Sequence, residues 1–267
     1  MQPGLFLKHG YIKICRYLFQ KKYLAIMAGP LKGYQWPVSR NYDYITGTFE
    51  PVEVIDEFCS WFTPGTVFYD IGSNIGYYSF IANTIVVSGK IYAVEPTPFN
   101  NDLFKQLLQV NKKKLAVNNI ELLAFAISDS EKEVEFSNNN IFAEGNTYVA
   151  TAENFIGKKI KVQCYSIDGL LQKGYAAPDI IKMDIEGAEY DALVGAAATL
   201  QKYKPSILLA THNCIEPGIS RKCVQYLEGL GYVLKHTGYQ NKTMAGLDDY
   251  LAVHKEKIKP VNTHQTV

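Results

Sequence analysis

Val67-Phe68-Tyr69-Asp70-Ile71-Gly72-Ser73-Asn74-Ile75-Gly76 is the stretch that decides the fold of this 267-residue chain. An apolar run ends in an acidic residue, two glycines then bracket Asn74, and an apolar helical pattern begins near Tyr77. This order is typical of a strand, a tight turn and the N-terminus of a helix. A second apolar run, from Lys90 to Val94, ends in Glu95, about 20 residues beyond the turn. The two linked units predict an α/β fold built on a parallel sheet.

The glycine turn also indicates the kind of ligand. Backbone N–H groups at such a turn face a nucleotide-like ligand, and an acid after the second strand holds a ribose hydroxyl. A dinucleotide fingerprint needs a third glycine where this chain has Tyr77. Asp70, just before the turn, would repel a pyrophosphate but suits an ammonium or a sulfonium. These two residues argue against the first alternative, an NAD-dependent oxidoreductase.

The spelling Asp70-x-Gly72-x-Asn74-x-Gly76 resembles motif I of the Rossmann-like S-adenosylmethionine (SAM) methyltransferases. Three further segments complete a resemblance to the FkbM family of methyltransferases over roughly residues 45–213: Gly47-Thr48-Phe49-Glu50-Pro51, Glu95-Pro96-Thr97-Pro98-Phe99-Asn100 and Lys182-x-Asp184-x-Glu186-Gly187-Ala188-Glu189. The resemblance implies a Rossmann-like class I methyltransferase fold. It also implies SAM as the cofactor and methyl transfer to a hydroxyl of a sugar, polyketide or other small acceptor. It does not identify the acceptor.

The expected fold is a seven-stranded, mostly parallel sheet with helices on both faces and a terminal antiparallel hairpin. The expected strands cover residues 66–69, 90–94, 120–127, 179–183 and 205–210, with the hairpin at 232–235 and 250–253. The expected helices cover residues 77–86, 98–110, 188–196 and 220–230. A β-rich insertion near 131–165 has expected strands at 134–136, 147–150 and 160–165.

Three regions divide the chain: a helical N-terminal extension over 1–62, a methyltransferase domain over 63–255 and a polar tail over 256–267. A basic, aromatic-rich helical pattern runs from Leu5 to Met27. It could cover the core, lie on a membrane surface or pack on a second subunit. We expect it to cover the core, because its apolar residues occur on several faces. The formation of a homo-oligomer through this extension remains an alternative.

Polar side chains gather at the expected carboxyl ends of the strands, where open α/β sheets bind ligands. Glu95 is expected to accept hydrogen bonds from a ribose, and Asp70 to orient the turn or an ammonium. Ser128 and Asp129 either reach an adenine or form a plain turn. The full expected set of cofactor contacts is Asp70, Gly72, Ser73, Asn74, Gly76, Glu95, Pro96, Ser128 and Asp129.

His212 is the expected general base, because it alone among the histidines falls at the edge of the site. Asp184 is its expected catalytic neighbour. Glu186 has a site role or caps a helix, whereas capping alone is expected for Glu189. Asp184 with Asn213 or His212 resembles the ligand layout of magnesium-dependent O-methyltransferases, but a histidine suits magnesium poorly. We therefore expect no metal, and metal dependence stays an alternative.

Composition excludes several classes of protein. The net charge of +1 does not indicate nucleic-acid binding. Five cysteines without a C-x-x-C pair predict reduced thiols. The sequence has no uncharged run of 18 residues, so we expect no transmembrane helix. We expect a cytoplasmic enzyme acting on a small-molecule or glycan acceptor. A catalytically silent SAM-fold binding module is the remaining alternative.

Overall fold

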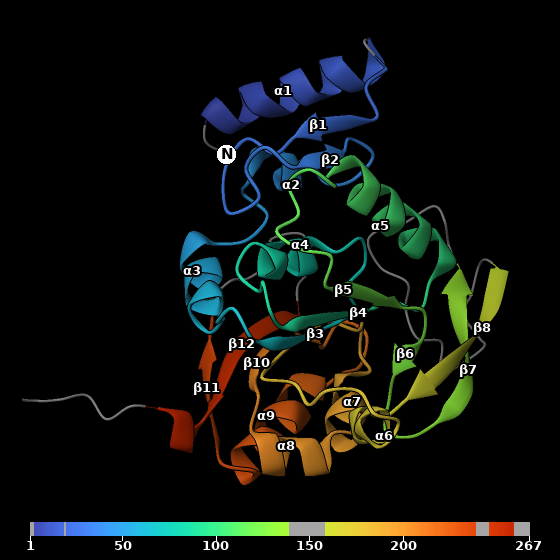
Figure 1. Ribbon diagram of the computed structural model, residues 1–267, viewed down its shortest axis with the longest axis vertical. Helices are drawn as coiled ribbons and strands as arrows, with labels where there is room; N and C mark the ends of the chain where they lie inside the picture. Colours follow the sequence, from blue (N-terminus) through green and yellow to red (C-terminus); the bar gives the residue numbers. More distant parts are fainter. Residues whose placement is uncertain (1–2, 19, 139–157, 239–245, 259–267) are drawn as a thin grey trace, which may run out of the picture.

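The computed structural model describes residues 3–18, 20–138, 158–238 and 246–258. Its main sheet has seven strands in the order β11-β12-β10-β9-β3-β4-β5 (Figure 1). Five of them run parallel: β3 (Val67–Ile71), β4 (Lys90–Val94), β5 (Ile120–Leu123), β9 (Ile180–Met183) and β10 (Ser206–His212). The terminal hairpin of β11 (Tyr232–His236) and β12 (Leu247–His254) adds the antiparallel pair. The predicted fold class is confirmed.

The order of the strands reverses between β3 and β9. From β3 the chain builds outward through β4 to β5, then returns to the other side of β3 for β9 and β10. Asp70 lies opposite Lys182 and Ile71 opposite Met183, so Gly72 and Asp184 follow side by side at one edge. Ligands of open α/β sheets bind at such a switch point.

Helices bury both faces of the sheet, which is why its strands read as continuous apolar runs. Adjacent residues of β3 show the division, since Phe68 packs into one hydrophobic cluster and Tyr69 into the other. On the Phe68 side, Figure 1 shows α3 (Val52–Ser60), α4 (Tyr77–Asn83) and α5 (Pro98–Val110). On the Tyr69 side lie α6 (Ile167–Gln172), α7 (Glu189–Val194), α8 (Ala197–Tyr203) and α9 (Ile219–Gly229).

The N-terminal extension is not one long helix. α1 (Pro3–Tyr17) ends early, and a hairpin of β1 (Tyr23–Ala25) and β2 (Gln35–Pro37) follows, then α2 (Tyr42–Thr46). The expected helix is therefore wrong beyond Tyr17. The hairpin prevails because it places Trp36, which is fully buried, in the core that contains Phe68 and Phe80. Residues of 23–62 thus pack on the core, whereas the covering expected of the Leu5–Met27 pattern is met in α1 only by Ile12 and Cys15, since Leu7, Tyr11 and Ile14 are exposed.

The insertion forms a second sheet beside the first. β8 (Lys158–Tyr165) pairs with β6 (Ala126–Ile127) and β7 (Lys132–Asn138). The single strand expected over 120–127 is wrong, because Leu123 ends a strand of the main sheet while Ala126 pairs with Cys164 of β8. The strand expected at 147–150 lies outside the described residues.

Other boundaries also differ from expectation: α4 ends at Asn83 rather than near residue 86, and β3 continues to Ile71 rather than ending at Tyr69. The helix expected over 188–196 ends at Val194 as α7, and α8 begins only at Ala197. Gly195 lies between them, where a Cβ would lie 2.2 Å from the carbonyl oxygen of Ser128. β10 continues through His212 rather than ending at Ala210, since Thr211 and His212 still pair with β12.

Candidate active site

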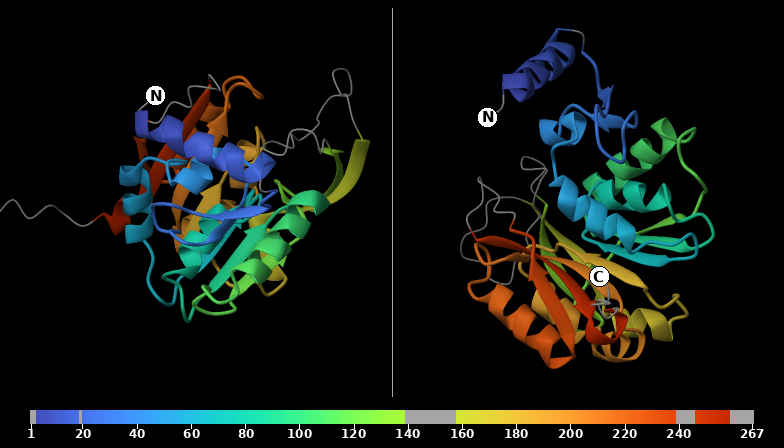
Figure 2. Two further views of the ribbon diagram at one scale, coloured as in Figure 1. Left: turned by 90° about the horizontal axis from the view of Figure 1, so that it is seen from above. Right: turned by 90° about the vertical axis from the view of Figure 1, so that its left-hand side faces the viewer.

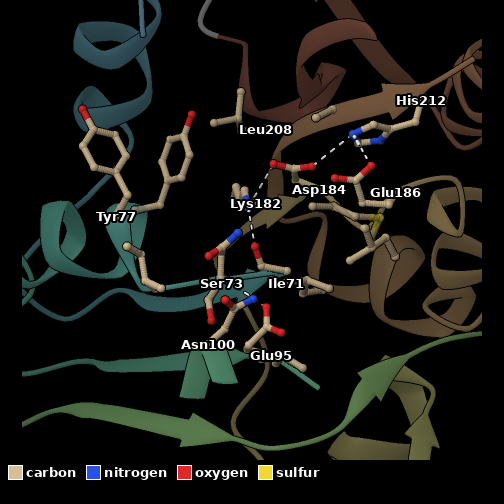
Figure 3. Close-up of a pocket in the computed structure, with 18 of the residues that line it drawn as sticks. Ile71, Ser73, Tyr77, Glu95, Asn100, Lys182, Asp184, Glu186, Leu208 and His212 are labelled. Atoms are coloured by element: carbon tan, nitrogen blue, oxygen red, sulfur yellow. Dashed lines mark hydrogen bonds and ion pairs between the residues drawn. The ribbon is translucent and has the colours of Figure 1, made fainter. Parts of the chain in front are cut away.

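A cavity of about 900 Å³ lies at the switch point of the sheet (Figure 3). One end is formed by the loops after β3, β4 and β6, the other by the loop after β9, by the end of β10 and by the N-terminal extension. The first end is lined by Gly72, Ser73, Asn74, Glu95, Pro96, Thr97, Asn100 and Ser128. The second is lined by Tyr44, Phe49, Glu50, Tyr77, Tyr78, Asp184, Glu186, His212 and Asp249.

The backbone of the glycine turn is bonded within the protein. The N–H groups of Gly72 and Ser73 both donate to the carbonyl oxygen of Val94, each at 3.0 Å. The N–H of Asn74 donates to Oε2 of Glu95 at 3.0 Å. These donors are therefore not available to a pyrophosphate, whose binding at such a turn relies on free N–H groups. The expectation that backbone N–H groups of the turn face a nucleotide-like ligand is thus wrong for Gly72, Ser73 and Asn74.

Side chains at this end of the cavity leave polar atoms for a ligand. Ser73 Oγ and Asn74 Oδ1 are buried without a hydrogen-bond partner among the described residues. Glu95 is buried, which raises its pKa even though Thr97 and other donors stabilise the carboxylate. Its carboxylate, with about four acceptor sites, already accepts from Asn74 N, Thr97 N, Thr97 Oγ and the Asn100 side chain, so a ligand hydroxyl here shares a site with one of these donors. Buried polar atoms are rarely left unpaired, so these groups fit a polar ligand such as the ribose end of SAM.

A buried lysine connects the two ends of the cavity. Lys182 Nζ donates to the carbonyl oxygen of Gly72 at 2.9 Å and lies 3.7 Å from Asp70 Oδ1 and 3.5 Å from Asp184 Oδ2. Burial lowers the pKa of Lys182, but the charges of Asp184 and Asp70 outweigh it and the net shift is upward. Sequence reasoning gave Lys182 no role, although a lysine within the apolar strand β9 was a usable signal.

Asp70 lies beneath the turn and does not line the cavity. It is fully buried, and Ser79 donates to its Oδ2 at 2.6 Å. Burial raises the pKa of Asp70, against the opposing effects of Lys182 and Ser79. Asp70 thus supports the turn from below through Lys182.

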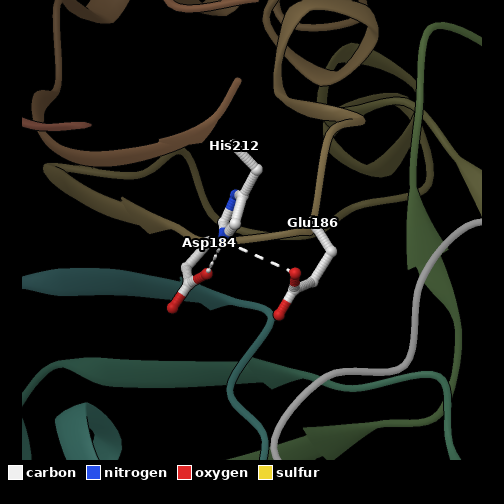
Figure 4. Close-up of side chains that lie close together, drawn as sticks. All are labelled: Asp184, Glu186 and His212. Carbon is white, nitrogen blue, oxygen red and sulfur yellow. Dashed lines mark ion pairs between the residues drawn. The ribbon is translucent and has the colours of Figure 1, made fainter. Parts of the chain in front are cut away.

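Three carboxylates surround His212: those of Asp184 and Glu186, seen in Figures 3 and 4, and that of Glu189. Its Nδ1 lies 2.7 Å from Oε1 of Glu189, which is fully buried. Its Nε2 lies 3.4 Å from Asp184 Oδ1 and 3.6 Å from Glu186 Oε2. Because a carboxylate only accepts, Nδ1 carries the proton of the short bond. Capping alone, the role expected for Glu189, is therefore wrong. Its Oε1 accepts from Gly187 N at 3.0 Å and also from His212 Nδ1.

This arrangement shifts the pKa values of the cluster. Burial lowers the pKa of His212, but the hydrogen bond to Glu189 and the charges of Asp184 and Glu186 outweigh it and raise the pKa to about 9. Burial raises the pKa of Glu186 to about 7, against the opposing charge of His212. Burial also raises that of Asp184, but Lys182 and His212 bring the net shift downward. His212 is therefore mainly cationic at neutral pH, and Glu186 titrates there.

One group of side chains has the spacing of a metal site. Ligand atoms of Asp184, Glu186 and His212 lie within 4.8 Å of one another (Figure 4). One imidazole and two carboxylates suit Mn²⁺ or Zn²⁺ better than Mg²⁺, which favours oxygen. The pair of Asp184 and Asn213 is not formed, because the Asn213 amide donates to Asp248 at 2.8 Å and accepts from Ser220 N at 3.2 Å.

Two other expected contacts do not line the cavity. Gly76 precedes α4, and a Cβ there would lie 2.2 Å from the ring of Phe104, so packing accounts for this glycine. Asp129 bonds to Ser128, Ser130 and Lys132 at the surface, where Lys132 lowers its pKa. Ser128 itself does line the cavity.

Comparisons with known proteins agree with this architecture. Residues 70–234, more than half of the chain, match the methyltransferase FkbM domain. The hexuronic acid methyltransferase AglP of Haloferax volcanii is 29% identical over 152 residues, which are 57% of this chain and 58% of that protein. The chain thus matches less than two thirds of that relative's length.

A solved structure shows the same fold. The methyltransferase FkbM from Methylobacillus flagellatus KT has a TM-score of 0.52 at 17% identity, covering 79% of this chain and 48% of that one. At this level of identity the likeness concerns the fold alone. The reversal of the sheet between β3 and β9 and the cavity at that edge agree with the matched domain. The chain belongs to the FkbM family of methyltransferases.

Proposed function

We propose that the protein transfers a methyl group from SAM to a hydroxyl of a sugar or glycan. One observation carries this proposal: a single cavity joins the Gly72–Asn74 turn and Glu95 to the cluster around His212. Bound SAM supplies a methyl group on a sulfonium, which needs a nucleophile in line. Placement of the acceptor alone contributes several kcal/mol to such a reaction.

The turn and Glu95 hold the cofactor in this proposal. Glu95 accepts from the ribose hydroxyls, while Ser73 Oγ and Asn74 Oδ1 gain the partners they lack within the chain. The carboxylates of Asp184 and Glu186 place negative charge near the expected position of the sulfonium. A cationic ligand is favoured there, in contrast to the phosphates of NAD.

The other end of the cavity suits a polyhydroxyl acceptor. Four aromatic side chains line it, and Phe49 stacks on Tyr44 with ring centroids 3.8 Å apart. Burial raises the pKa of Glu50 to about 8 and that of Asp249 to about 7. A protonated carboxyl both donates and accepts hydrogen bonds, as sugar hydroxyls require. The name of the Haloferax relative, a hexuronic acid methyltransferase, also supports a sugar acceptor.

Glu186 is the group best matched to take the acceptor's proton. Its pKa of about 7 lies near the working pH, where a general base is most effective. Glu186 also has a left-handed backbone, φ 54°, a strained conformation that clusters at functional sites. His212, cationic and held by Glu189, then positions Glu186 and Asp184 instead of acting as the neutral base expected from the sequence.

Isothermal calorimetry and mass spectrometry test the function in two steps. We expect binding of SAM and S-adenosylhomocysteine but not of NAD. Incubation with SAM and a pool of glycans should give products heavier by one methyl group in place of a hydrogen. Tight NAD binding without SAM binding would refute the methyl donor. SAM binding without any product from a broad acceptor pool favours the silent binding module.

A further inference from the structure

Positive charge is concentrated at one end of the chain. The first 40 residues contain seven basic residues and no aspartate or glutamate, so the rest holds 20 of the 27 basic residues and all 26 acidic ones. All five lysines of the first 40 residues are exposed, and none forms an ion pair within the described part of the chain: Lys8, Lys13, Lys21, Lys22 and Lys32. The net charge of +1 conceals this asymmetry.

α1 presents one side to the protein and a different one to solvent. Ile12 and Cys15 are buried against the extension. Leu7, Tyr11, Ile14 and Leu18 recur every three or four residues, which places them along one side of a helix. They are 74%, 53%, 48% and 74% exposed, and Tyr17 beside them is 67% exposed. We call these five residues the apolar stripe.

The apolar stripe differs from the other exposed apolar residues. Elsewhere in the described ranges such residues are scattered on different elements, as Val52, Val87 and Val233 are, and need no explanation. The apolar stripe is contiguous, and Figure 2 shows α1 at the outer edge of the molecule, away from the sheet.

We propose that α1 binds the surface of a bilayer containing anionic lipids. An amphipathic helix with aromatic and aliphatic residues on one side and lysines beside them lies in the headgroup plane. The apolar stripe would enter the headgroup region while Lys8, Lys13, Lys21 and Lys22 contact lipid phosphates. None of the described helices is long and apolar enough to cross a membrane, so binding is peripheral.

The alternative partner, a second copy of this chain, is disfavoured by charge. A two-fold interface brings the same patch of both subunits together, so the lysines around the apolar stripe would face one another. An anionic bilayer instead offers the complementary charge over a wide area.

Membrane binding would bring the cavity to the bilayer. His9 Nε2 of α1 lies 3.2 Å from Asp43 Oδ1 of α2, and Asp43 lines the cavity. Binding of α1 to a bilayer would not require any particular methyl acceptor.

Vesicle co-sedimentation tests the proposal on the full chain. Wild-type protein should pellet with phosphatidylcholine vesicles that contain phosphatidylglycerol, much less with phosphatidylcholine alone, and less in high salt. Lys13→Ala should lower partitioning about fivefold, the effect of one basic residue at an anionic surface. Tyr11→Ser should also reduce binding, whereas Val233→Ser, equally exposed at 53% on β11, should not.

A second measurement covers variants that lose stability. Tyr11→Trp keeps an aromatic residue in the apolar stripe, and its fluorescence should shift to the blue on anionic vesicles. Absence of both binding and shift would overturn the proposal, as would equal binding to neutral vesicles. Sedimentation velocity that shows a dimer, lost in Tyr11→Ser, together with no vesicle binding, would assign the apolar stripe to a second copy instead.

Discussion

Glu189 holds His212 in place through a buried hydrogen bond of 2.7 Å between Oε1 and Nδ1. This bond fixes which ring nitrogen faces the cavity, because Nδ1 must donate to the carboxylate. Nε2 is then directed to Asp184 and Glu186. The Glu189 carboxylate therefore favours the protonated form of the His212 ring, which is buried.

Glu189→Gln should lower the pKa of His212, which is about 9 in the native protein. Because this pKa is raised above the roughly 6.5 of an unfolded chain, the imidazolium stabilises the fold fully below about pH 6.5 and this contribution is lost as pH rises through about 9. In the variant, the free energy of unfolding should fall over a narrower pH range, because the pKa of His212 lies closer to that of the unfolded chain. NMR titration of the His212 ring measures the shift, with exposed Glu53→Gln as control. Equal titration midpoints in wild type and variant would contradict the role of Glu189.

The sequence predicted the sheet well because its signals are local. The glycine turn after Ile71 and the apolar runs of β3, β4 and β9 need no knowledge of distant residues. The resemblance to FkbM methyltransferases supplied the rest of the topology. The hairpin around Trp36 was missed because only tertiary packing favours it over a helix.

The candidate site was predicted less completely, for a related reason. Residues after strands, such as Asp184 and Glu95, were placed correctly at the cavity by the rule for open sheets. The roles of Lys182 and Glu189 depend on partners that the fold brings to them, Gly72 and His212. No local pattern distinguishes a capping glutamate from one that accepts a histidine N–H.

Gly72→Ala should destabilise the fold, not only the cofactor site. A Cβ at Gly72 would lie 1.9 Å from the carbonyl oxygen of Asp184, and the residue has φ +75°. The left-handed backbone alone costs about 1–2 kcal/mol for a residue with a Cβ, and the clash adds to it. Thermal unfolding measures the loss. Gly174→Ala is the control, since it has φ +94° and open space around its Cβ. Equal losses in the two variants would show that the clash is relieved without cost.

Glu95→Gln should weaken SAM binding by about 1–3 kcal/mol, the range for losing hydrogen bonds to a charged group. The amide keeps the shape of the side chain, but one of its two ends can no longer accept from Asn74 N or Thr97 N. Calorimetry with SAM measures the change. Thr97→Val, which removes only the hydroxyl bonded to Glu95, should have a smaller effect. Unchanged SAM affinity in Glu95→Gln would show that the ribose does not bind this carboxylate.

Glu186→Gln separates the two candidate bases of the cluster. Burial raises the pKa of Glu186 to about 7, so its basic form accumulates as pH rises through 7, and the wild-type kcat should rise with that midpoint. Glu186→Gln should lower kcat by roughly 10²–10⁴, the usual contribution of a general base, and abolish the rise while leaving SAM affinity nearly unchanged. Exposed Glu53→Gln serves as the matched control. If the variant instead keeps a limb with a midpoint near 9, the proton goes to His212, whose pKa lies there. Near-normal turnover at every pH would leave placement of the acceptor as the main source of rate.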